Sequence, residues 1–85
     1  MPVICEFSGV KICMYYDEHL PPHVHVYGSD FSAAVSVPEG ETLRGKLPHG
    51  IESRVRKWVR RNAAVLMENW YRARRGETFL RVPAK

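Results

Sequence analysis

The hydrophobic period of the chain changes at Gly50, and this change constrains the fold more than any other feature of the sequence. Before Gly50, apolar and polar residues alternate in short runs separated by turn residues, which is typical of strands. After Gly50, apolar residues recur at the helical spacing of about 3.6 residues. Because a chain of 85 residues has material for one small core, we expect a single α+β domain over residues 1–85.

The first half of the chain predicts an antiparallel meander of four to five strands. Ser8-Gly9 is a typical two-residue hairpin turn, and Pro38 and Gly40 mark a later turn. Pro21-Pro22 interrupts the pattern, because two prolines do not fit inside a paired strand. The expected strands span residues 3–7, 10–16, 23–27, 31–37 and 42–46.

The chain contains two cysteines, which are too few for a disulfide framework. The hairpin sets Cys5 opposite Ile12 and Ile4 opposite Cys13, so the two thiols point to opposite faces of the sheet. We therefore expect both cysteines to be reduced. The N-terminal residues lack the pattern of a signal peptide, and no apolar run approaches the roughly 18 residues of a membrane span. These features predict a cytoplasmic protein.

The second half predicts one long amphipathic helix over residues 51–75. Its apolar residues fall within an arc of about 120°; they are Ile51, Val55, Trp58, Val59, Leu66, Trp70 and Ala73. Such a helix would be about 37 Å long, which exceeds the width of a small sheet. A kink or break near Asn62 is therefore the alternative, since asparagine is a good N-cap. Gly76 is a natural helix end, and residues 77–85 are expected to form a loose tail or an edge strand.

Positive charge is concentrated in this second half. Residues 1–50 carry three Lys/Arg and six Asp/Glu, a net charge of −3, whereas residues 51–85 carry ten and three, a net charge of +7. Two basic runs stand out: Arg54, Arg56, Lys57, Arg60 and Arg61, then Arg72, Arg74 and Arg75. Such clusters favour binding to the phosphates of nucleic acid or to an acidic partner protein. The alternative is a solvated helix face.

The stretch "HLPPHVHV" contains three of the four histidines. Alternation along a strand places His23 and His25 on one face, which we expect not to be needed for burial, and Val24 and Val26 on the core face. His19 precedes the two prolines, and a bend there would bring it back toward the pair. Imidazole binds zinc, copper, nickel and iron, so His19, His23 and His25 are candidate ligands of a divalent metal.

The same three histidines are also candidate catalytic acids or bases, because histidine titrates near neutral pH. The alternative is a strand entry whose histidines make ordinary hydrogen bonds. Asp17 and Glu18 are close enough in sequence to complete a metal shell or to orient an imidazole. Tyr15 and Tyr27 flank the histidines and are candidates either for stacking on a nucleic-acid base or for the core.

Several motifs resemble the prokaryotic family of the domain of unknown function 4160. They are "MYYDEHLPPHVHVYG" at residues 14–28, "GKLP" at 45–48 and "ENW" at 68–70. The resemblance implies a small bacterial cytoplasmic protein, often encoded beside another small domain of unknown function, in an arrangement similar to a toxin–antitoxin pair. One departure is the segment 30–33, "DFSA", where the family usually has a more acidic strand.

Three functions follow as hypotheses. The first is a component of a toxin–antitoxin-like pair that binds a small partner protein encoded nearby, nucleic acid, or both. The second is a histidine-centred enzyme of the nuclease type, with or without a metal. The third is a metal-binding module without catalysis.

Overall fold

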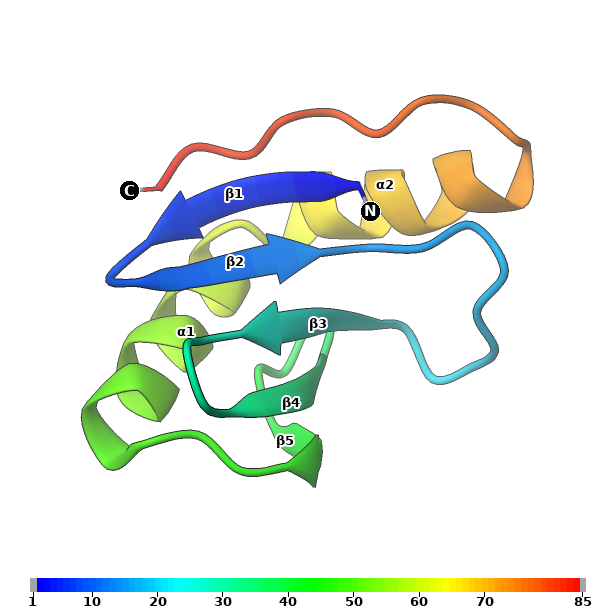
Figure 1. The fold of residues 1–85 in the computed structure, drawn as a ribbon. Coiled ribbons are helices and arrows are strands. Elements are labelled where there is room, and N and C mark those ends of the chain that lie inside the picture. Colours follow the sequence, from blue (N-terminus) through cyan, green and yellow to red (C-terminus); the bar gives the residue numbers. More distant parts are fainter. Residues whose placement is uncertain (1, 85) are drawn as a thin grey trace.

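Five strands form one antiparallel sheet whose strand order follows the chain. The computed structural model describes residues 2–84 and is shown in Figure 1. The elements are β1 (Val3–Phe7), β2 (Val10–Cys13), β3 (His23–Tyr27), β4 (Ser32–Ser36), β5 (Thr42–Gly45), α1 (His49–Arg61) and α2 (Ala63–Arg74). The predicted α+β class and five-strand meander are confirmed. No helix in residues 2–84 combines the length and the hydropathy that crossing a bilayer requires.

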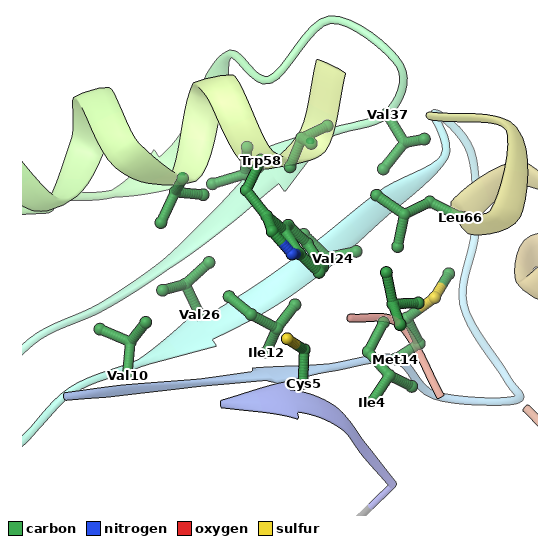
Figure 2. Close-up of a cluster of buried hydrophobic side chains, with 14 of the residues drawn as sticks. Ile4, Cys5, Val10, Ile12, Met14, Val24, Val26, Val37, Trp58 and Leu66 are labelled. Carbon is green, nitrogen blue, oxygen red and sulfur yellow. The ribbon is translucent and has the colours of Figure 1, made fainter. Parts of the chain in front are cut away.

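The core lies between one face of the sheet and the two helices, which Figure 1 shows on the same side. In Figure 2, the Trp58 side chain projects from α1 toward Val24 and Ile12, with Leu66 of α2 beside it. Trp58 is 0% exposed. Full burial of one large apolar side chain contributes roughly 1.5–3 kcal/mol, so these contacts hold the helices on this face.

β1 contains an irregularity that the sequence did not predict. Cys5 lies opposite Ile12, as expected, but Cys13 lies opposite Val3 rather than Ile4, because the register shifts between Val3 and Cys5. This bulge lets consecutive residues, Ile4 and Cys5, both enter the core. Both cysteines are free and buried, as predicted, and burial raises the pKa of each thiol.

Three strands are shorter than predicted. β2 ends at Cys13 instead of residue 16, while β4 and β5 cover 32–36 and 42–45 instead of 31–37 and 42–46. The apolar run continues through Met14, but the next two side chains turn away to other partners. The Tyr15 hydroxyl bonds to the Tyr27 hydroxyl, and the Tyr16 ring stacks on Phe79.

The prediction of one helix over residues 51–75 was wrong in its continuity, because Asn62 separates α1 from α2. The Asn62 backbone and side-chain amides both donate hydrogen bonds to the Trp58 carbonyl, at 3.0 and 2.9 Å. A straight helix of this length would extend past the sheet, whereas the break lets buried residues of both halves pack on it. The alternative of a break near Asn62 is the one that the structure adopts.

The C-terminal residues 77–84 form no regular strand but are bonded to the fold. Figure 1 shows this segment running alongside β1. The Val82 amide donates to the Ile4 carbonyl at 3.0 Å, and the Trp58 indole donates to the Pro83 carbonyl at 2.8 Å. The Asn69 side chain makes two hydrogen bonds to the Leu80 backbone, at 2.9 and 2.7 Å. The segment is therefore neither a loose tail nor a regular edge strand.

Gly45 at the end of β5 supplies the first test of the fold. Its φ is +76°, and a Cβ there would lie 2.2 Å from the Ser32 carbonyl oxygen and 2.8 Å from the Ala33 Cα. We expect Gly45→Ala to lower the free energy of unfolding by more than the roughly 1–2 kcal/mol of a left-handed backbone alone. Urea denaturation monitored by tryptophan fluorescence measures the change.

Gly9→Ala is the matched control, because Gly9 has a φ of +78° and, apart from Gly9 and its two chain neighbours, no atom lies within 4 Å of the point that its Cβ would occupy. The Gly9→Ala variant has the same unfavourable left-handed backbone but no steric clash of the new Cβ. Equal losses of stability in the two variants would show that the close approach at Gly45 is unimportant.

Candidate metal centre

The candidate site lies on the sheet face opposite the core, at the end of β3 where Trp70 of α2 reaches the His23 ring. Strand alternation places His23, His25 and Tyr27 of β3 on this face, while the valines between them enter the core. The residues of β4 that pair with these three are all small; they are Ser36, Ala34 and Ser32. The small side chains leave room beside the histidines.

The loop between β2 and β3 brings Glu18 onto the two histidines. The Nε2 atom of His25 is hydrogen-bonded to Glu18 Oε1, and the Nε2 atom of His23 lies 3.6 Å from the same oxygen. Burial works against the charged carboxylate, but the hydrogen bond and charge interactions with His25 and His23 outweigh it and lower the pKa of Glu18. Glu18 is therefore an ionised carboxylate at neutral pH.

His23 is held in one orientation by the backbone. Its Nδ1 atom lies 2.7 Å from the Pro21 carbonyl oxygen, which can only accept, so Nδ1 carries a proton, and in the neutral ring Nε2 would present its lone pair. His23 is 5% exposed, and its Nε2 has no hydrogen-bond partner within residues 2–84. The expectation that this face is not needed for burial was wrong for His23. An imidazole that donates its other N–H to a carbonyl is typical of metal ligands.

Glu18, His23 and His25 can each offer one ligand atom, and these three atoms all lie within 4.8 Å of one another. Ligand atoms around a tetrahedral zinc ion are about 3.4 Å apart, so the more distant of these atoms would have to move closer together to share one ion. His19, which the sequence grouped with the other two histidines, is exposed and lies outside this group. The sequence noted Glu18 as a possible shell residue but did not rank it above His19, because an irregular loop has no side-chain period.

Two tyrosines and a tryptophan enclose the histidines. The Tyr15 ring packs edge-on against His25 at 4.8 Å between centroids, and the Tyr27 ring stacks on His25 at 6.2 Å. The two tyrosine hydroxyls are 2.9 Å apart, and this hydrogen bond, together with burial, raises the pKa of Tyr15. Trp70 of α2 lies 5.5 Å from the His23 ring. The tyrosines flank the site as predicted and bond to each other.

A family profile described as a domain of unknown function (DUF4160) matches residues 9–71. The chain belongs to this family. No curated protein and no solved structure matches it significantly. The match runs from the β1–β2 turn to α2, so the DUF4160 region includes the loop and strand that carry Glu18, His23 and His25.

The eight predicted basic residues of this DUF4160 chain fall into three groups. Four of them form ion pairs with acidic residues: Arg56, Arg60, Arg72 and Arg75. A fifth, Arg74, donates to the Glu18 carbonyl and lies over the Trp70 ring. The other three, Arg54, Lys57 and Arg61, line one hollow of about 260 Å³ beside β1. None of these three takes part in an ion pair within the described chain.

The orientation of His23 can be tested directly. At about pH 9, where histidine side chains are neutral, we expect the metal-free protein to carry the His23 proton on Nδ1, because the Pro21 carbonyl accepts it. Long-range ¹H–¹⁵N spectra distinguish the two tautomers. The exposed His19 serves as the reference for an unconstrained ring. A His23 proton found on Nε2 would contradict the orientation described here.

Proposed function

We propose that Glu18, His23 and His25 bind one divalent metal ion and that this ion is the Lewis-acid centre of a hydrolytic enzyme. The observation that carries the proposal is the buried Nε2 of His23, which has no partner in residues 2–84 and faces the Glu18 carboxylate. A ligand set of two imidazoles and one carboxylate suits zinc or ferrous iron.

A metal-free hydrogen bond between Glu18 and His25 is the simpler interpretation of the same side chains. It accounts for the Nε2 of His25 and for the lowered pKa of Glu18. It leaves His23 less well explained, because its Nδ1 is fixed by a carbonyl while its buried Nε2 lies 3.6 Å from Glu18 Oε1, beyond hydrogen-bond distance. Because leaving a buried polar atom unbonded costs about 1–3 kcal/mol, a shared ion explains all three residues better.

The ligand count favours catalysis over a purely structural role. Structural zinc sites are closed by four protein ligands, whereas catalytic sites have three and keep one position open. Cys13 pairs with His25 across the strands but does not belong to the ligand group. A hollow of about 160 Å³, lined by His25, Tyr27 and Arg44, adjoins the site. A divalent ion bound by Glu18, His23 and His25 would polarise an ester or phosphoryl oxygen of a molecule in this hollow.

The proposal predicts one bound divalent ion per chain. Titration with Co²⁺, followed by its absorption spectrum, and with Zn²⁺, followed by calorimetry, measures the stoichiometry and affinity. We expect Glu18→Gln and His25→Ala to weaken binding by at least tenfold, which is roughly the lower bound for losing even an outer-shell partner.

His19→Ala is the matched control, because it removes an imidazole from the same loop but from outside the ligand group. It should bind the ion as the unaltered protein does. Circular dichroism of each variant separates loss of a ligand from loss of the fold. Absence of Co²⁺ and Zn²⁺ binding in the unaltered protein, or an equal loss in His19→Ala, would overturn the proposal.

As a second candidate function, we propose that Arg54, Lys57 and Arg61 bind the phosphate backbone of RNA. The supporting observation is that these three cations share one hollow, while most of the other basic residues of the helices are paired with carboxylates. An acidic partner protein, encoded nearby as in a toxin–antitoxin-like pair, is the alternative ligand of this surface. Exposed phosphate contacts give strongly salt-dependent binding.

Two triple variants that remove the same charge test the second candidate. Replacing Arg54, Lys57 and Arg61 by alanine should weaken RNA binding. It should also reduce the steepness of the plot of log binding constant against log salt concentration by about two, since each phosphate contact to single-stranded RNA contributes about 0.7. Replacing the ion-paired residues Arg56, Arg60 and Arg75 by alanine should have a smaller effect. Fluorescence anisotropy at several salt concentrations measures both. Equal losses, or no RNA binding at low salt, would contradict this function.

A further inference from the structure

We propose that the substrate of the metal centre is a small phosphate ester whose phosphoryl group binds between the ligand group and Arg44. This inference rests on the proposed metal-dependent function and adds the substrate class. Arg44 is the residue that carries it, since neither the ligand group nor the basic surface of the helices includes it.

The strand register places Arg44 on the same face as the histidines. Arg44 lies opposite Ala34, and Ala34 lies opposite His25, so a single methyl group separates arginine from histidine across the sheet. Arg44 lines the hollow of about 160 Å³ with His25 and Tyr27. It also lines a second hollow, of about 210 Å³, with His19, His23 and Leu43 among the other lining residues. Arg44 therefore stands between the two hollows.

The charges at this position suit a phosphoryl dianion. No ion pair within residues 2–84 includes Arg44, whose side chain is exposed. With a divalent ion bound, the single negative charge of Glu18 leaves one positive charge, and Arg44 supplies another. A planar guanidinium donates two parallel hydrogen bonds to phosphate oxygens. Lys11, opposite Tyr27 on β2, adds positive charge to the same face.

The two hollows fit the two parts of a small ester. Both are smaller than the roughly 300–1,000 Å³ of pockets that enclose a drug-sized ligand. The first hollow is lined by His25 and takes the phosphoryl group. The second has an apolar wall that includes Leu20 and Leu43, which are 65% and 45% exposed. That wall takes the organic group of the ester, and His19 lies in it beside Leu20.

The reaction assigned to this arrangement is hydrolysis, with water as the co-reactant. The water oxygen forms a bond to phosphorus, the phosphorus–oxygen bond to the organic group breaks, and a water proton passes to the departing oxygen. No oxidant or reductant is consumed. Arg44 binds the phosphoryl oxygens, and the residues that line the two hollows orient the ester.

Inorganic phosphate is the first probe, added to protein already loaded with Zn²⁺. Calorimetry should detect phosphate binding that Arg44→Ala weakens by about tenfold or more, as expected for a charge-assisted hydrogen bond, while Zn²⁺ affinity is unchanged. Arg44→Lys should recover part of the affinity, because it keeps the charge without the planar fork. Lys46→Ala removes a neighbouring charge that lines neither hollow and should have no effect.

Phenyl phosphate is the second probe, chosen to fill both hollows. It should bind more tightly than inorganic phosphate, and Leu43→Ala should abolish that difference. Tyr71→Ala removes an exposed aromatic residue of α2 that lines neither hollow, and should leave the difference in affinity between the two phosphates unchanged.

The outcomes separate the substrate assignment from the metal site. Zn²⁺ binding without phosphate binding, or phosphate binding that is equal in Arg44→Ala, would overturn the assignment and leave the metal centre standing. Failure to bind Zn²⁺ would overturn the proposed function itself. Equal affinity for the two phosphate probes would overturn the role of the second hollow.

Discussion

The two helices cover one face of the sheet, and this asymmetry determines how the rest of the chain is used. Trp58, Leu66 and the valines of β3 bury their apolar surface on that side. The opposite face lies outside this core, although Trp70 of α2 reaches His23 at one end of it, so it does not need to be apolar. A polar cluster on this face is therefore compatible with a core as small as this chain can build.

The polar cluster and the helices are nevertheless connected through the loop between β2 and β3. Arg74 at the end of α2 donates a hydrogen bond to the Glu18 carbonyl at 3.1 Å, and its guanidinium lies 5.1 Å from the Trp70 ring centre. Trp70 in turn contacts the His23 ring. Holding the Glu18 carboxylate beside two imidazoles removes it partly from water, which costs desolvation energy. The packing of α2 helps to hold the loop in the position where the histidines offset that cost.

Side-chain period explains which parts of the fold and the site were predictable. β1 and β3 have the predicted bounds, and His23 and His25 share a face as alternation requires. The early end of β2 was not predictable, because the tyrosines that follow it are drawn to partners distant in sequence. The choice of Glu18 over His19 depends on how an aperiodic loop turns. The break at Asn62 follows from the limited size of the sheet. The spacing of apolar residues along the helix carries no information about that size.

The hydrogen bonds of residues 77–84 tie this largely exposed segment to buried residues of the fold. A protein shortened after Gly76 would lose the partner of the Trp58 indole, both partners of the Asn69 side chain and the bond to the Ile4 carbonyl in one step. Two of those residues, Trp58 and Asn69, are fully buried. The sheet would also gain an unprotected edge at β1, the kind of surface through which chains associate into aggregates. Residues 77–84 thus protect the edge of β1 although they form no strand of their own.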